Sequence, residues 1–100
     1  MATNVTVPCS DITPGSGKVV EAGGKQIALF NIGGAFYAID NTCMHSGGPL
    51  GEGTLNENVV TCPWHGWRFD VATGACLNNP AGKVASYETK VENDQLFVKL

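Results

Sequence analysis

Basic residues and long hydrophobic runs are both scarce in this sequence, and each scarcity argues against a class of protein. Only six Lys and Arg residues accompany nine Asp and Glu, which gives a net charge of −3 at neutral pH. A nucleic-acid-binding surface needs clustered Lys and Arg, so we expect no nucleic-acid partner. No apolar stretch approaches the length of a membrane span, and no basic segment followed by an apolar run opens the chain. We therefore expect no membrane association and a cytoplasmic location.

The chain is short and rich in glycine. Its 100 residues support one compact domain, and its 13 glycines are concentrated in the middle of the sequence. Glycine favours turns and close approaches of the backbone, so this distribution is typical of a turn-rich β protein. Because a domain of this size has a small core, a tightly bound metal would add useful stability.

Strand-like runs recur at short intervals with turn residues between them, whereas no window of ten or more residues has a helical period. We predict strands at residues 4–7, 18–21, 26–32, 35–40, 59–62, 68–71, 84–91 and 95–100. The expected fold is all-β, an antiparallel β-sandwich or small barrel. A loop-rich stretch at about 41–81 interrupts a β base formed by 1–40 and 82–100, and 1–100 is a single domain.

The last two predicted strands alternate between apolar and polar residues. One face of the first would carry Ala85, Tyr87, Thr89 and Val91. In the second, Leu96, Val98 and Leu100 alternate with Phe97 and Lys99. A turn at 92–94 would join these two strands into a closing hairpin.

Two short clusters in the loop-rich stretch contain both histidines and two of the four cysteines. They are Cys43-Met44-His45 and Cys62-Pro63-Trp64-His65, with 16 residues between His45 and Cys62. Thiolates and imidazoles on two loops can converge on one centre, either a tetrahedral zinc site or a mixed-ligand iron–sulfur cluster. A C₂H₂ finger would instead place two Cys before two His. If the cysteines bind one iron and the histidines the other, the arrangement is that of a Rieske cluster.

The spacing Cys-x-His, sixteen residues, Cys-x-x-His resembles the motif of the Rieske [2Fe–2S] family. The flanking residues are also similar, at 62–70, Thr73-Gly74, Asn79-Pro80-Ala81 and the closing hairpin, so the likeness spans essentially the whole chain. It implies that one Rieske-type [2Fe–2S] cluster is bound by Cys43, His45, Cys62 and His65. It also implies the Rieske fold, an antiparallel β base with an inserted cluster-binding subdomain. There Pro80, in a third loop, would cover the cluster, and Gly47-Gly48-Pro49 would turn the first ligand loop.

The same resemblance predicts a low reduction potential. An oxidised Rieske cluster has zero net charge, because two ferric ions balance two sulfides and two thiolates and the two imidazoles are neutral. Its reduction potential is therefore higher than that of an all-cysteine cluster, and the term low refers to the range within the Rieske family. Rieske proteins of respiratory complexes carry an extra disulfide between their ligand loops, and its positions are Gly48 and Trp64 here. They also carry hydroxyl groups where this chain has Trp67 and Phe69. Fewer hydrogen bonds to sulfur stabilise the reduced state less, so we expect a potential of about −150 mV.

Several other residues have simpler expected roles. We predict that Cys9 and Cys76 are buried free thiols, because neither has a Cys or His neighbour. Trp64 and Trp67 are expected to pack within the loop region rather than meet a partner, and Leu50 is expected to anchor the first loop. The acidic residues are scattered, so no paired-carboxylate catalytic site is indicated.

The leading functional hypothesis is a soluble one-electron carrier, resembling the Rieske ferredoxins of aromatic-ring dioxygenase systems. Its partners would be a flavin-dependent NAD(P)H ferredoxin reductase and a terminal oxygenase. Catalysis by this chain alone is not expected, because both histidines are used by the cluster and no glycine-rich nucleotide motif is present. Two alternatives remain open, a small Rieske-like subunit of an assimilatory nitrite reductase and a zinc-stabilised binding module without a redox role.

Overall fold

The fold consists of two antiparallel sheets in a computed structural model. The structure describes residues 4–22, 24–41, 49–64, 66–78 and 82–99. The larger sheet has the order β1-β9-β8-β4-β3-β2. Its strands are β1 (Asn4–Pro8), β2 (Ser16–Ala22), β3 (Lys25–Ile32), β4 (Ala35–Asp40), β8 (Ser86–Glu92) and β9 (Gln95–Lys99). The smaller sheet contains β5 (Thr54–Asn56), β6 (Val59–Thr61) and β7 (Arg68–Asp70). Short 3₁₀ turns, η1 (Cys9–Asp11) and η2 (Leu50–Glu52), complete the described elements.

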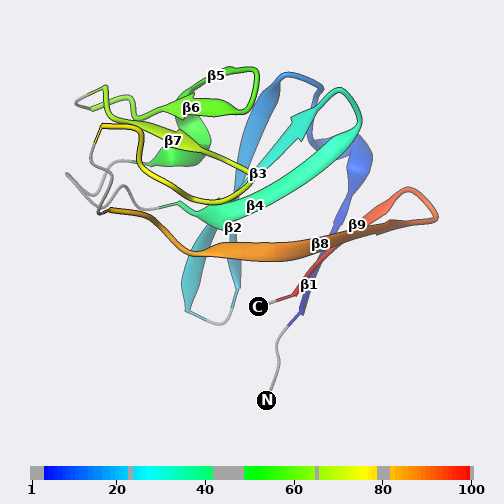
Figure 1. The fold of residues 1–100 in the computed structure, drawn as a ribbon. Helices are drawn as coiled ribbons and strands as arrows, with labels where there is room; N and C mark the ends of the chain where they lie inside the picture. Colours follow the sequence, from blue (N-terminus) through cyan, green and yellow to red (C-terminus); the bar gives the residue numbers. More distant parts are fainter. Residues whose placement is uncertain (1–3, 23, 42–48, 65, 79–81, 100) are drawn as a thin grey trace.

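The smaller sheet is inserted in the chain between β4 and β8. Figure 1 shows it over one end of the larger sheet, away from β1 and the end of β9. The all-β prediction is confirmed, and all eight predicted strands occur, β4 with the predicted bounds. The three-residue strand β5 was missed, because one inward residue, Leu55, gives no readable alternation. No described helix is long and apolar enough to cross a membrane.

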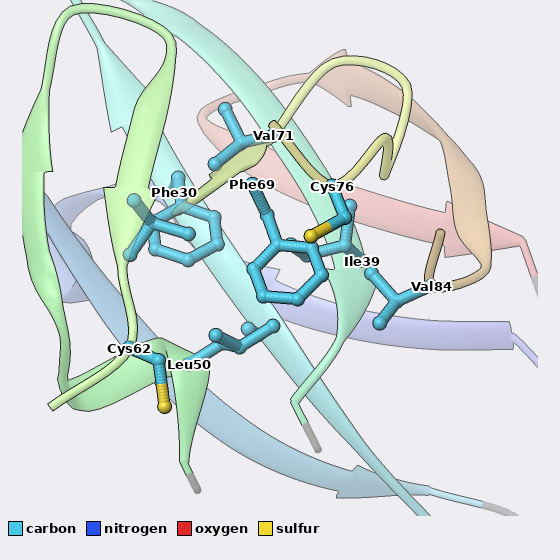
Figure 2. Packing of buried hydrophobic residues seen from close by; sticks show 10 residues of the cluster. Phe30, Ile39, Leu50, Cys62, Phe69, Val71, Cys76 and Val84 are labelled. Atoms are coloured by element: carbon cyan, nitrogen blue, oxygen red, sulfur yellow. The ribbon is translucent and has the colours of Figure 1, made fainter. Parts of the chain in front are cut away.

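Strand β3 separates two hydrophobic cores because successive side chains of a strand point to opposite faces. Ile27 and Leu29 face one core, and Ala28 and Phe30 face the other. The first, which we call the base core, contains Val7, Ile12, Ile27, Leu29, Ala38, Leu96 and Val98. The second, the loop-side core, contains Ala28, Phe30, Ile39, Leu50, Val60, Cys62, Phe69, Val71, Cys76 and Val84. It fills the space between the two sheets and is shown in Figure 2.

The closing hairpin forms as predicted, with Asn93 and Asp94 in its turn between the paired residues Glu92 and Gln95. Both turn residues have positive φ, 51° and 62°, as a type I′ turn requires. The inward positions of β9 are confirmed, since Leu96 and Val98 are buried. In the strand predicted at 84–91 the alternation was only partly right, because Ala85, which precedes β8, and Val91 are exposed.

Val91 lies beyond a short junction between β4 and β8. These strands pair only at Ala38↔Tyr87 and Ile39↔Ser86, so the far end of β8 is a sheet edge. Side chains reinforce the junction: Thr89 Oγ1 donates to Phe36 O at 2.8 Å, and the Tyr87 hydroxyl donates to Asp40 Oδ1 at 2.5 Å. Partial burial, and then the adjacent Asp40 carboxylate, raise the pKa of Tyr87 to about 12. Tyr87 therefore remains a neutral hydrogen-bond donor to Asp40 at neutral pH.

Candidate metal centre

Of the four predicted cluster ligands, Cys62 belongs to the described part of the structure. Cys43, His45 and His65 lie outside the described residues, as do Gly47, Gly48 and Pro80. The described part of the candidate site consists of Cys62 and of the residues at which the three predicted loops leave and rejoin the scaffold. Within the described residues, no group of three or more His, Cys, Asp or Glu side chains is arranged to hold a metal ion.

Cys62 follows β6 directly and is only 2% exposed, within the loop-side core. Its backbone N–H donates to Trp67 O at 2.7 Å, and its carbonyl accepts from Gly66 N at 3.1 Å. Gly66 has a φ of +75°, a conformation that favours glycine and turns the chain back toward β7. Figure 2 shows Cys62 beside Leu50 and well separated from Cys76 in the same core. The second predicted ligand loop thus begins at a buried thiol and is closed by backbone hydrogen bonds.

The first predicted ligand loop is closed by Asn41, the residue after β4. Its backbone carbonyl accepts from Leu50 N at 2.7 Å, and its side-chain Oδ1 accepts from Gly51 N at 2.7 Å. Asn41 is 3% exposed, and Leu50 is completely buried in the loop-side core, which confirms Leu50 as an anchor. Asn41 and Leu50, the residues that flank 42–49, are therefore held side by side on the scaffold.

The third predicted loop starts beside the second. Leu77 N donates to Arg68 O at 2.8 Å, and Arg68 N donates to the Asn78 side chain at 2.7 Å. This exchange places Asn78, which directly precedes residues 79–81, next to the first residue of β7. On the return side, Cys76 N donates to Gly82 O at 3.1 Å.

The bases of the three loops therefore meet on one side of the loop-side core. Leu50 from the first loop and Cys62 from the second belong to that core, and Arg68 binds the start of the third. The buried thiol of Cys62 at a loop base fits a cluster ligand, because the protein core shields that side of the centre from water. Thiolate and imidazole donors on such loops suit an iron–sulfur cluster. The β scaffold, the buried Cys62 and the two Cys–His motifs of the sequence are thus compatible with a metal centre at the loop bases.

The aromatic residues near Cys62 differ in exposure. Phe69 is fully buried in the loop-side core, and Trp67 packs against that core while partly exposed. Trp64, in contrast, is 60% exposed, so the prediction that it packs within the loop region is wrong. The loop from Cys62 to Trp67 is closed by backbone hydrogen bonds, and the Trp64 ring is not needed to hold it.

The two cysteines not predicted as ligands also differ. Cys76 is a free thiol, 4% exposed, as predicted. Cys9 is free but only partly buried, because it lies in η1 at the margin of the base core. Sequence analysis missed Asn41 and Asn78 as loop-closing residues. The available signal was an asparagine at the end of a strand or before a predicted loop, where its side chain can bind backbone N–H groups.

Comparisons with known proteins identify the class of this centre. The Rieske [2Fe–2S] domain family matches residues 3–88. The ferredoxin component of the naphthalene 1,2-dioxygenase/salicylate 5-hydroxylase systems of Ralstonia sp is 38% identical over 91 residues, 90% of this chain and 88% of that protein. The chain belongs to the Rieske [2Fe–2S] domain family, and the prediction from its ligand motifs is confirmed.

Solved structures support the same fold. A chain in the complex of reduced oxygenase and oxidized ferredoxin in carbazole 1,9a-dioxygenase superposes with a TM-score of 0.87 at 34% identity, covering 95% of this chain and 91% of that one. A chain described as an NADH-dependent nitrite reductase small subunit from Mycobacterium tuberculosis gives a TM-score of 0.91 at 25% identity, covering 100% and 96%. The fold is therefore shared by ferredoxins and nitrite reductase subunits, and it does not by itself distinguish them.

Proposed function

We propose that this protein is a one-electron carrier that passes electrons from an NAD(P)H-dependent flavin reductase to a terminal oxygenase. One Rieske-type [2Fe–2S] cluster would be bound by Cys43, His45, Cys62 and His65. The observation that carries this proposal is the pair of Cys–His motifs inside a Rieske domain that is 38% identical to a dioxygenase ferredoxin component across 88% of its length. When bound, the cluster accepts and releases a single electron.

The described residues would hold that cluster in two ways. Cys62 supplies a thiolate from within the loop-side core, so one side of the cluster is shielded from water and its potential is set by a fixed environment. Asn41, Asn78 and the turn at Gly66 close the three loop bases, which keeps the donors in place when the oxidation state changes. Small structural change on reduction is what rapid electron transfer requires.

Substrate oxidation would be the task of a partner. A Rieske oxygenase also needs a mononuclear iron, usually bound by two histidines and a carboxylate. This chain has two histidines in all, and both are assigned to the cluster. The low-potential expectation of about −150 mV agrees with a carrier that receives electrons from a reduced flavin.

The ligand assignment can be tested with two buried cysteines of the same core. Cys62→Ala should abolish the visible spectrum and the electron paramagnetic resonance signal of a Rieske cluster. Cys76→Ala is the matched control, because Cys76 is equally buried, at 4% against 2%, but is not a proposed ligand. The control should keep both signals. A Cys62→Ala protein that retains the wild-type cluster spectrum would overturn the assignment.

The electron route can be tested by reconstitution. NADH, a flavin-dependent ferredoxin reductase and a Rieske oxygenase should give substrate turnover only when the holoprotein is added. The nitrite reductase alternative rests on the TM-score of 0.91 to the small-subunit structure. It would be favoured if the holoprotein supported nitrite reduction by a large subunit and not oxygenase turnover. A colourless protein containing zinc would instead favour the binding module.

A further inference from the structure

Asn41 is a buried residue whose backbone and side chain both form hydrogen bonds to other segments. It is 3% exposed and directly follows β4. Its side-chain Oδ1 accepts from Gly51 N at 2.7 Å, and its Nδ2 donates to Gln26 Oε1 at 3.3 Å. Its backbone N–H donates to Gln26 O at 3.0 Å. With the Leu50 N–H on its carbonyl, Asn41 connects β3 to the residues at which the first predicted ligand loop rejoins the scaffold.

Gly51 cannot move far from this arrangement. A Cβ on Gly51 would lie 2.5 Å from Val19 Cγ2 and 3.0 Å from Asn41 Oδ1, so η2 is packed directly against β2 and Asn41. Gly51 is buried, and its N–H binds the Asn41 side chain. A buried N–H that loses its partner is costly, because water cannot replace the bond. The side chain of Asn41 therefore fixes this end of the loop together with the buried anchor Leu50.

We propose that Asn41 is a positioning residue for the [2Fe–2S] cluster, which fixes the two ends of the first ligand loop and thereby holds Cys43 and His45 in their binding geometry. The inference rests on the proposed function, because it takes Cys43 and His45 as ligands. Asn41 itself touches neither the cluster nor a partner in this proposal. It acts through the loop, two residues before the first ligand.

The consequence is a specific effect on the cluster rather than on the whole fold. Residues that orient metal ligands typically change metal affinity by roughly ten- to one-hundredfold when removed. Asn41→Ala removes the acceptor for Gly51 N and the donor to Gln26. Asn41→Asp keeps an oxygen in place for Gly51 N, and the exposed Gln26 amide can rotate to donate to the new carboxylate. The aspartate variant should therefore preserve the loop geometry that the alanine variant loses.

The experiment compares cluster release in the holoprotein and its variants. An iron chelator is added, and loss of visible absorbance is followed together with global unfolding by circular dichroism. Asn41→Ala should lose its cluster roughly tenfold faster than wild type and show shifted g values. Asn41→Asp should retain the wild-type g values, with a lowered midpoint potential from the added negative charge. Val98→Ala, in the base core, is the control for general destabilisation and should leave both the g values and the potential unchanged.

Two outcomes would overturn the inference. The first is that Asn41→Ala releases its cluster at the wild-type rate and has wild-type g values. The second is that Asn41→Ala accelerates cluster release no more than a Val98→Ala protein of equal stability does. If Asn41→Ala does not fold, the cluster release rate of Gln26→Ala tests the inference instead. Gln26 is exposed, and its substitution removes only the hydrogen bond that Asn41 Nδ2 donates to it. Faster release supports the inference and a wild-type rate contradicts it. A wild-type protein without a Rieske signal would refute the proposed function instead.

Discussion

The two faces of β3 support two different kinds of core. The base core is entirely aliphatic and is built from strands of five to eight residues, β1, β3, β4 and β9, with Ile12 from the segment after β1. The loop-side core contains two cysteines and a buried aromatic pair, Phe30 and Phe69, and its covering strands have only three residues each. Regular strand pairing stabilises the first core. The second depends on turns, a close-packed glycine and asparagine side chains.

This difference separates stability from function. The base core lies on the opposite face of β3 from the core that contains Cys62, the predicted ligand that the structure describes, so its side chains need only fill space. The loop-side core has Cys62 as a member and borders all three loop bases, so its side chains also determine what surrounds the cluster. Mutations on the base side should therefore change the free energy of unfolding alone, and mutations on the loop side should change redox behaviour.

The largest expected effect tests the base side. Leu96 is completely buried in the base core, and Leu96→Ala should lower the free energy of unfolding by about 2–5 kcal/mol. Urea unfolding measures this loss. The midpoint potential of the folded holoprotein should stay at the wild-type value. A potential that shifts with this substitution would show that the two cores are coupled through β3.

The next effect tests the exposed loop residue Trp64. A tryptophan that is 60% exposed gains much by desolvation against a partner, so Trp64→Ala should slow reduction of a terminal oxygenase roughly tenfold. Stopped-flow absorbance follows the oxygenase, and the potential of the variant should not change. Val91→Ala is the control, since Val91 is 48% exposed on β8 in the closing hairpin. Equal slowing in both variants would argue against docking at Trp64.

A smaller effect is expected at the junction of β4 and β8, which joins β1, β9 and β8 to β4, β3 and β2 in the larger sheet. Tyr87→Phe removes the hydroxyl that donates to Asp40 and should cost about 1 kcal/mol at neutral pH. The folded pKa of about 12 lies above the ordinary value of 10.0, so the Tyr87 contribution is complete below pH 10 and is lost as the pH rises through 12. Unfolding free energies across this range should show the two proteins converging. Parallel curves would contradict the role of the Asp40 bond.

The contrast between the cores also explains what sequence could predict. Strand-like runs bounded by turn residues identified β1, β3, β4 and β9, and alternation in the last two runs together with the Asn93-Asp94 turn identified the closing hairpin. Ligand types and spacing identified the family. The strand β5 was too short to be recognised, although it pairs with its neighbour β6. An asparagine at a strand end indicates that Asn41 and Asn78 can bind backbone N–H groups, but their partners, such as Arg68 for Asn78, are set by the fold.

The smallest expected effect tests whether the loop-side core tunes the potential. Phe69 is completely buried in the core that contains Cys62, and Phe69→Tyr adds a hydroxyl where sulfur atoms are the expected acceptors. A hydrogen bond to cluster sulfur stabilises the reduced state, so the midpoint potential should rise by roughly 20–40 mV, equivalent to about 0.5–1 kcal/mol. Protein-film voltammetry measures the shift. Phe97→Tyr makes the same chemical change on β9, between β1 and β8 of the larger sheet, and should leave the potential unchanged. A lowered or unaltered potential in Phe69→Tyr would mean that the added hydroxyl does not reach the cluster sulfurs. The low potential would then need another cause than the lack of a hydroxyl at position 69.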